Sequence, residues 1–260
     1  MTKKAGKQRI DLLLVERELE ISRERARARI LAGEVRVGTT VVDKPGTMIP
    51  EDADISLTGG GLRFVSRGGL KLEQALIHFN IDVTGSTAID VGASTGGFTD
   101  CLLQRGAARV YAVDVGYGQL AWKLRSDPRV VVLERANIRT LDPALVPEIP
   151  SLAVIDCSFI GLGKVLPPTL RFLAPDAAIV ALVKPQFEVG PALLGKNGVV
   201  RDANARAEAI ARVTEEARLL GLQVLGGVDC ATPGPMGNVE YLLWARLTEA
   251  TRRPPIEPLA

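Results

Sequence analysis

The strongest constraint on the fold of this chain is the regular alternation of apolar, strand-like segments with helical segments over residues 87–246. The predicted strands are 87–91, 109–115, 129–133, 152–156, 177–184, 222–228 and 238–246, and the predicted helices are 69–79, 97–105, 119–125, 160–172 and 202–220. Apolar strands that alternate with helices form a mostly parallel sheet covered on both faces. The last two strands leave no room for a helix between them, which predicts an antiparallel pair. The pattern indicates an α/β fold with a doubly wound, seven-stranded, Rossmann-like sheet that binds ligands at the carboxyl ends of its strands.

The N-terminal residues follow a different pattern, which predicts a small α+β domain. Apolar residues at helical spacing predict two helices, the second of which begins at the N-cap Ser22 and ends at Gly33. Alternating residues at 34–38 and 40–42 predict a β-hairpin, and the run Gly59-Gly60-Gly61 marks a boundary. We therefore predict a small domain at 1–60, a linker at 61–66, a large domain at 67–250 and a Pro-rich tail at 251–260.

The net charge of +2 conceals an uneven distribution, because residues 1–44 hold eleven Lys and Arg against seven Asp and Glu. Arginines at 23, 25, 27 and 29 form two i,i+4 pairs on separate faces of the second predicted helix. Such a helix can also be simply solvated, with Glu24 as a partial counter-charge. Further basic residues in the same domain favour binding to a phosphate backbone. The candidate residues for this contact are Lys7, Arg9, Arg23, Arg27, Lys44 and Arg67.

The single histidine and the three scattered cysteines exclude several kinds of chemistry. His78 lies in a helical run, where a partly buried and inactive histidine is the simpler interpretation, so Ser-His-Asp and Cys-His machinery is disfavoured. Cys101, Cys157 and Cys230 form no C-x-x-C pair, so we predict no metal site and a reducing compartment. The longest apolar stretch, 177–183, is too short to span a membrane, and no signal peptide is evident, so we expect a cytoplasmic protein without a membrane partner. The sequence does not indicate an oligomeric state.

A Gly-rich turn joins the first predicted strand to the helix that follows it, with the sequence Asp-Val-Gly-Ala-Ser-Thr-Gly-Gly-Phe-Thr over residues 90–99. Glycines let a backbone approach a ligand closely, and the amides of a helix N-terminus then face that ligand. The turn lacks the second glycine of the dinucleotide fingerprint and the Gly-Lys-Ser/Thr end of a P-loop. These absences disfavour a dinucleotide site and an ATP or GTP site, and one remaining interpretation is a purely structural turn. The other comes from the pattern D-x-G-x-x-x-G-G, which resembles the first motif of S-adenosylmethionine-dependent methyltransferases.

The resemblance of this motif assigns roles to residues at three predicted strand ends. Gly92, Ser94 and Gly96 would wrap the methionine part of the cofactor. Asp114 would accept hydrogen bonds from both ribose hydroxyls, and Asn137 would lie at the edge of the adenine. The predicted cofactor-binding residues are Gly92, Ala93, Ser94, Thr95, Gly96, Gly97, Asp114, Asn137 and Asp156.

Four charged residues near the ends of predicted elements are candidates for catalysis. Lys71 opens the helix before the first strand, Asp156 and Lys184 end the fourth and fifth strands, and Glu240 lies on the last. A structural ion-pair network would also explain them, because a charge at the end of an apolar strand is costly unless it is paired. Methylation of a ribose 2′-hydroxyl needs a base at the oxygen and a methyl donor held in line. A lysine can be that base beside a second cation and carboxylates, so we interpret Lys184 as the base, Lys71 as the cation, and Asp156 and Glu240 as orienting carboxylates.

Two other methyl-transfer chemistries fit the residues less well. The loop 156–159 lacks the Asn/Asp-Pro-Pro-Tyr/Phe motif of many N-methylating enzymes. Cys157 lacks the Pro-Cys motif of cysteine-dependent C5 methylation of pyrimidines. We interpret Cys157 as a buried bystander.

Over nearly its whole length the chain resembles the TlyA-type rRNA methyltransferases, which join an S4-like RNA-binding head to an FtsJ/RrmJ-like ribose 2′-O-methyltransferase domain. The matching stretches are 65–68, 71–72, 92–98, 114–120, 182–188 and 237–241. The resemblance places the family's Lys-Asp-Lys-Glu tetrad on Lys71, Asp156, Lys184 and Glu240.

The resemblance also implies the cofactor, the substrate and the partner. The cofactor would be S-adenosylmethionine, and the reaction would be 2′-O-methylation of a cytidine in ribosomal RNA, in 16S, 23S or both. The N-terminal domain would dock on RNA or on a ribosomal subunit. Two alternatives are an RNA-binding or ribosome-binding protein without turnover and a membrane-active haemolysin, a label that family members have carried. The Arg-rich helix has no wide apolar face that would support membrane activity.

Overall fold

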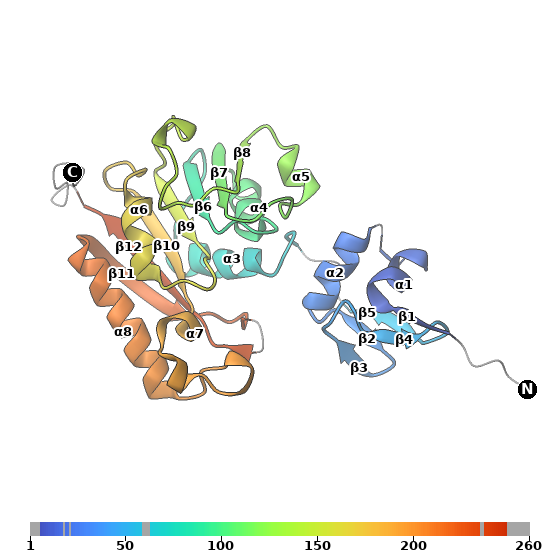
Figure 1. Cartoon of the computed structure of the whole chain (residues 1–260). Coiled ribbons are helices and arrows are strands. Elements are labelled where there is room, and N and C mark those ends of the chain that lie inside the picture. The colour runs from blue at the N-terminus through green and yellow to red at the C-terminus, as the bar shows by residue number, and fades with distance from the viewer. Residues whose placement is uncertain (1–5, 18, 21, 59–62, 235–236, 249–260) are drawn as a thin grey trace, which may run out of the picture. The chain divides into compact units, whose positions relative to one another are not determined.

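The structure is a computed structural model that describes residues 6–17, 19–20, 22–58, 63–234 and 237–248. The chain divides into two compact units, Met1–Arg67 and Gly68–Ala260, which we call the N-terminal and C-terminal units. Part of the predicted linker, residues 61–62, and the whole predicted tail at 251–260 lie outside the described residues. Figure 1 shows both units with their helices and strands labelled.

The N-terminal unit is a small α+β fold. Its elements are β1 (Lys7–Arg9), α1 (Ile10–Glu16), α2 (Arg23–Leu31), β2 (Val35–Val37), β3 (Thr40–Val42), β4 (Met48–Pro50) and β5 (Ile55–Leu57). Strand β2 pairs antiparallel with β3 and β5, and β1 pairs antiparallel with β4. The side chain of Ser22 accepts a hydrogen bond from the amide of Arg25, which confirms the predicted N-cap.

The two predicted helices and the hairpin of this unit are confirmed, but β1, β4 and β5 were not predicted. Each of these strands has only three residues, which is too short for a recognisable alternation of apolar and polar side chains. The buried core that holds the helices on the strands consists of Ile10, Leu13, Leu14, Ala26, Ile30, Val35, Val42 and Ile49.

The C-terminal unit is built on one seven-stranded sheet with the order β11-β12-β10-β9-β6-β7-β8. The strands are β6 (Thr87–Val91), β7 (Arg109–Asp114), β8 (Val130–Glu134), β9 (Leu152–Ile155), β10 (Ala178–Val183), β11 (Leu222–Asp229) and β12 (Tyr241–Leu247). Neighbouring strands from β10 to β8 are parallel, and β12 lies antiparallel between β10 and β11. The predicted α/β class, the seven strands and the antiparallel last pair are confirmed.

Both faces of this sheet are buried. Ile89 and Val91 of β6 belong to a core that includes residues of α8, such as Val213. Successive side chains of a strand point to opposite faces, so Ala88 and Asp90, which are also fully buried, face the other layer. This burial on both faces explains why the strand segments are apolar throughout in the sequence.

The helices connect the strands in the order expected, with several differences in extent. The α-helices are α3 (Gly68–His78), α4 (Gly97–Gln104), α5 (Trp122–Arg125), α6 (Leu166–Leu170), α7 (Pro185–Glu188) and α8 (Ala203–Leu219), and the 3-10 turns are η1 (Pro143–Leu145), η2 (Leu162–Lys164), η3 (Pro191–Leu193) and η4 (Lys196–Gly198). Helix α3 packs on α4, while α8 packs on β11 and α7 (Figure 1). Within the described parts of the chain, no helix has the length and apolar character needed to cross a membrane.

Three predictions about local structure were wrong. The predicted helix 160–172 is divided into η2 and α6, because Pro167 and Pro168 have no amide to donate to the preceding turn. The predicted strand 238–246 begins only at Tyr241, since Asn238 is held in a turn by a hydrogen bond from the amide of Gly234 (2.9 Å). Glu240 therefore precedes β12 instead of lying on it.

The third correction concerns His78, which is exposed and not partly buried. It is the last residue of α3, one position before the predicted end at residue 79, and its ring contacts that of Phe79 edge to face with centroids 4.8 Å apart. Leu72, Ala75 and Leu76 form the buried face of α3, whereas its last two residues, Ile77 and His78, are both exposed.

Candidate active site

The Gly-rich turn between β6 and α4 depends on left-handed backbone at two glycines. Gly92 has φ +89° and Gly96 has φ +94°. A Cβ atom on Gly92 would lie 2.7 Å from the carbonyl oxygen of Asp156. This distance is too short, so no residue with a side chain fits at position 92. The turn therefore packs directly against the end of β9, and this close approach brings Asp156 beside the candidate cofactor loop.

Asp114, at the end of β7, is held by backbone amides of the same region. Its Oδ2 accepts a hydrogen bond from the amide of Ser94 (2.7 Å), and its Oδ1 accepts one from the amide of Gly116 (2.6 Å). The Ser94 hydroxyl also donates to the side-chain oxygen of Gln119 (3.3 Å). These contacts orient the carboxylate, and each oxygen keeps a lone pair for a further donor.

The other predicted cofactor residues lie at neighbouring strand ends. Thr95 accepts a backbone hydrogen bond from Ala121 (3.2 Å), while Ala93 is buried and Ser94 is exposed. Asn137 is exposed just beyond β8, and its side-chain oxygen accepts a hydrogen bond from the amide of Arg139 (3.0 Å). The predicted residues thus line the carboxyl ends of three adjacent strands, β6, β7 and β8, and their contact with a cofactor stays a prediction.

The four predicted catalytic residues form two ion pairs. Lys71, on α3, contacts Glu240, whose side chain has no exposed area. The Lys184 Nζ lies 2.6 Å from Asp156 Oδ1 and donates a hydrogen bond to the Ser158 hydroxyl (2.8 Å). Both lysine side chains are only 9% exposed, whereas Asp156 is 22% exposed. Each buried cation therefore has a carboxylate partner, as burial of charge requires.

The register of the sheet explains why these pairs meet. Val183 of β10 pairs with Tyr241 of β12, so the next residues outward on the two strands are Lys184 and Glu240. Gln186 links the two ends, because its side-chain amide donates to Glu240 Oε1 (3.4 Å). The pKa of the Cys230 thiol is raised by burial and also responds to the charges of Lys71, Glu240 and Asp156. All four charged residues therefore belong to one region at the carboxyl end of β10.

The structure shows which carboxylate each lysine contacts, a point that the predicted roles left open. Lys71, predicted as the cation beside Lys184, pairs with Glu240, and Lys184 pairs with Asp156. The reason is that Lys71 comes from α3, which packs near β12 and so reaches Glu240. The sequence alone does not show this, because residues 71 and 240 lie 169 positions apart.

Three residues of the site were not predicted as functional. Ser158 contacts Lys184, and Gln186 contacts Glu240. Phe159 is 90% exposed with φ +65°, and its ring lies 5.1 Å from that of Phe187. Their position in the sequence could have identified them. They follow Asp156 and Lys184 by two or three residues, where a strand ends and a loop begins.

Two titratable groups lie beside the charged region, the fully buried Asp90 and the partly buried Cys157. Burial raises the pKa of Asp90 to about 7, a hydrogen bond from the Thr99 hydroxyl (2.7 Å) opposes this, and the charges of Asp156 and Asp114 add to it. Burial also raises the pKa of the Cys157 thiol to about 12. A thiol with so high a pKa is almost fully protonated at neutral pH, which supports the interpretation of Cys157 as a bystander.

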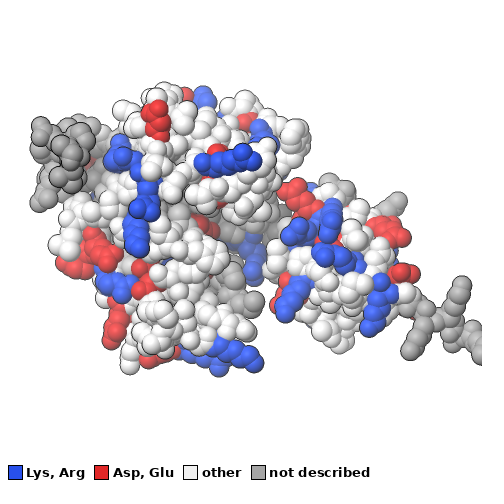
Figure 2. Space-filling view, viewed as in Figure 1, with Lys and Arg blue, Asp and Glu red and all other residues white. Residues whose placement is uncertain are grey.

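The predicted nucleic-acid residues of the N-terminal unit fall into two groups. Arg9 and Arg23 form ion pairs with Asp11, whereas Lys7, Arg27 and Lys44 are exposed. Arg67 is partly buried just before α3. Figure 2 shows basic side chains beside acidic ones on this unit. Contact of any of these residues with RNA stays a prediction.

The counter-charges of the Arg-rich helix are not where the sequence suggested. Arg25 and Arg29 both contact Glu20, which is 6% exposed, and no ion pair of Glu24 occurs among the described residues. The i,i+4 pair 25/29 does share one face of α2, as predicted. The acidic residues that pair with α2 flank the helix in the sequence, with Asp11 and Glu20 before it and Glu34 after it, so Glu24 is not the counter-charge that the alternative interpretation assumed.

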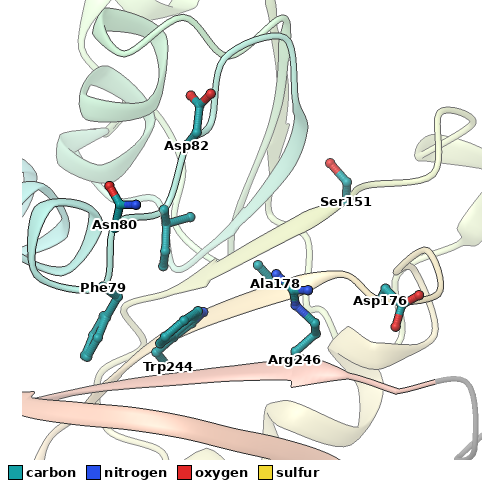
Figure 3. A pocket seen from close by; sticks show the side chains of 9 residues that line it. Phe79, Asn80, Asp82, Ser151, Asp176, Ala178, Trp244 and Arg246 are labelled. Atoms are coloured by element: carbon teal, nitrogen blue, oxygen red, sulfur yellow. The ribbon is translucent and has the colours of Figure 1, made fainter.

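A cavity of about 490 Å³ lies in the C-terminal unit. It is at the end of β10 opposite to the end where the two lysine–carboxylate pairs lie. Figure 3 shows Phe79, Trp244 and Arg246 among its lining residues, with Ala178 at the first position of β10. Lys184 follows the last residue of the same strand, so the length of β10 separates the cavity from the ion pairs. Among the described side chains no group of three His, Cys, Asp or Glu could hold a metal ion.

The sheet order and the Gly-rich turn are those of a Rossmann-like methyltransferase. Residues 64–247 match the family model of the FtsJ-like methyltransferases, and residues 8–55 match that of the S4 domain.

Known proteins similar to this chain share both parts. The 16S/23S rRNA (cytidine-2'-O)-methyltransferase TlyA of Mycobacterium tuberculosis is 49% identical over 93% of this chain and 91% of that protein. Hemolysin A of Brachyspira hyodysenteriae is 39% identical over 85% of this chain and 92% of that protein. A solved structure from Streptococcus thermophilus superposes with a TM-score of 0.74 at 44% identity, covering 94% of this chain and 90% of the other. The chain belongs to the TlyA family of FtsJ-like methyltransferases.

Proposed function

We propose that this protein is an S-adenosylmethionine-dependent methyltransferase that modifies the ribose 2′-oxygen of a cytidine in ribosomal RNA, with its N-terminal unit docking on the RNA. The observation that carries the proposal is the meeting of the Lys184–Asp156 and Lys71–Glu240 pairs beside the Gly-rich turn. The substrate named for the Mycobacterium tuberculosis relative supports the choice of rRNA. A ribosomal substrate also implies a cytoplasmic location.

The residues at the ends of β6 and β7 suit a nucleoside-type cofactor. Asp114 presents a carboxylate already oriented by the amides of Ser94 and Gly116, and a carboxylate at this point of a doubly wound fold accepts hydrogen bonds from vicinal ribose hydroxyls. Gly92, Ala93, Ser94, Thr95, Gly96 and Gly97 would hold the methionine part, with Asn137 near the base and Asp156 near the amine. When bound, S-adenosylmethionine supplies an electrophilic methyl group on a sulfonium.

The chain's own contribution to chemistry would be proton transfer and orientation. In its neutral amine form, reached by loss of a proton to solvent, Lys184 would take the proton of the ribose 2′-hydroxyl while the oxygen bonds to the methyl carbon and the sulfur–methyl bond of the cofactor breaks. Asp156, 2.6 Å away, and the Ser158 hydroxyl, at 2.8 Å, would hold the lysine Nζ in place. Lys71 and Glu240 would form the second wall of the site, joined to the first by Gln186. Phe159, 90% exposed beside this region, offers an aromatic face to the substrate.

Methyl transfer tests the proposal directly. The full chain would be incubated with methyl-labelled S-adenosylmethionine and either purified ribosomal subunits or rRNA, and the digested RNA analysed by mass spectrometry. We expect label on the ribose of cytidine. Absence of label would leave an RNA-binding protein without turnover, and label on a base would refute the proposed chemistry.

Asp114→Ala should weaken cofactor binding by at least about 10- to 100-fold, because even one of its two hydrogen bonds from the ribose hydroxyls contributes roughly 1.5–3 kcal/mol. The measurement is calorimetric titration with S-adenosylhomocysteine, with thermal unfolding as the check on folding. Asp82→Ala is the matched control, because Asp82 lines the cavity at the opposite end of the strands. Its loss should leave the affinity for S-adenosylhomocysteine unchanged. Equal affinities of Asp114→Ala and the unmodified protein would contradict the assignment.

A further inference from the structure

We propose that the buried carboxylate of Asp11 is a positioning residue for RNA recognition, which holds the guanidinium groups of Arg9 and Arg23 together as one phosphate-binding pair. The inference deepens the proposed function and rests on it, because the partner is RNA. Asp11 itself would not touch the RNA and would act through the two arginines.

The geometry joins three parts of the N-terminal unit at one carboxylate. Asp11 lies in the first turn of α1 and has no exposed area. Arg9, at the end of β1, donates from Nε to Oδ1 and from Nη2 to Oδ2, both at 2.9 Å. Arg23, the first residue of α2, donates from Nε to Oδ2 at 3.0 Å. One buried group therefore fixes two side chains that are 14 positions apart.

Asp11 stays negatively charged when it is paired with the two arginines, so it can hold them in place. The hydrogen bond from Arg9 is the largest influence and lowers the pKa of Asp11 to about 2 against the opposing effect of burial, with Arg23 adding to the lowering. The carboxylate is consequently ionised throughout the physiological range. With two guanidinium groups around it, the cluster keeps a net positive charge and can attract a phosphate.

Both arginines keep donors for a ligand. The Asp11 contacts use Nε and Nη2 of Arg9 and Nε of Arg23, which leaves Nη1 of Arg9 and both terminal nitrogens of Arg23 outside this network. Their side chains are 41% and 51% exposed. A guanidinium that is oriented before binding loses less conformational freedom when it meets a phosphate.

A second buried carboxylate in the same unit provides a useful contrast. Glu20 also contacts two arginines, but Arg29 is only 14% exposed while Arg25 is 58% exposed. That cluster therefore presents one accessible guanidinium, whereas Asp11 presents two. The paired, outward arrangement at Asp11 is the one that matches adjacent phosphate oxygens of an RNA backbone.

The test uses the sign of a change in affinity. Removal of a negative charge by Asp11→Asn should strengthen RNA binding if only net charge matters. If Asp11 positions the arginines, binding of the full chain to labelled 23S or 16S rRNA transcript should weaken by about tenfold, and the salt dependence should become shallower by about one phosphate contact. Asp52→Asn is the matched control, because it removes the same charge from an exposed side chain and should leave the affinity unchanged or slightly increased.

A second variant guards against a loss of folding in Asp11→Asn, which thermal unfolding would report. Arg23→Lys keeps Asp11 and the charge but removes the guanidinium fork, so it should weaken binding several-fold although net charge is constant. Suppose that the unmodified protein binds and methylates rRNA. Unchanged or tighter binding by folded Asp11→Asn, or by Arg23→Lys, would then overturn the inference about Asp11 and leave the proposed function standing. Failure of the unmodified protein to bind rRNA would overturn both the inference and the proposed function.

Discussion

Lys184→Ala should lower the rate of methyl transfer to rRNA by about 10²- to 10⁴-fold, the range typical of losing a positioned general base. The side chain of Lys184 is 9% exposed, and its Nζ lies 2.6 Å from Asp156 Oδ1. Lys184 directly follows β10, at the end of the sheet where the Gly-rich turn packs. Alanine leaves no group at this position to accept the proton of the 2′-hydroxyl. Single-turnover transfer of labelled methyl groups, at saturating cofactor, measures the effect on the chemical step.

Two further variants separate a base from a merely structural cation. Lys184→Arg retains a positive charge beside Asp156, but a guanidinium does not give up its proton in proteins, so this variant should fold normally and remain inactive. Lys164→Ala removes an exposed lysine of η2 from the same unit and should keep full activity. Full turnover by Lys184→Ala, or activity of Lys184→Arg near that of the unmodified protein, would refute the base assignment.

The second large effect concerns stability and pH, through Asp90. Its side chain is fully buried, and desolvation raises the pKa from 3.8 to about 7. The folded protein therefore holds a proton on Asp90 between about pH 4 and pH 7, where the unfolded chain has already released it. The stabilising contribution is complete below pH 4 and is lost as the pH rises through 7. The difference between the two pKa values corresponds to roughly 4 kcal/mol in the free energy of unfolding.

Asp90→Asn should remove this pH dependence, because a carboxamide does not ionise. Chemical denaturation at pH 5 and at pH 8 measures the free energy of unfolding of both proteins. We expect the value for Asp90→Asn to rise relative to that of the unmodified protein between pH 5 and pH 8. Other titrating groups change equally in both proteins, so the difference between the two pH profiles isolates Asp90. Asp229→Asn, which alters an exposed carboxylate, serves as the control. Parallel profiles for Asp90→Asn and the unmodified protein would show that Asp90 is ionised when folded.

Much of the C-terminal unit could be predicted from local signals. Strand β6 coincides with the predicted segment 87–91, and α4 begins at the predicted Gly97. Both follow from patterns within a few residues, namely an unbroken apolar run and glycines that require a left-handed backbone. The predicted helix at 160–172 was wrong for an equally local reason, since the two prolines interrupt it.

The sequence by itself determined the class of fold, the place of the Gly-rich turn and the identity of the four charged residues near the strand ends. Only the tertiary structure decided the partners: Lys71 with Glu240, Lys184 with Asp156, and Arg9 and Arg23 with Asp11. No local sequence pattern marks Asp11, yet it is buried beneath two arginines. Backbone preferences act over a few residues, whereas a buried charge takes whichever opposite charge the fold brings within hydrogen-bonding distance.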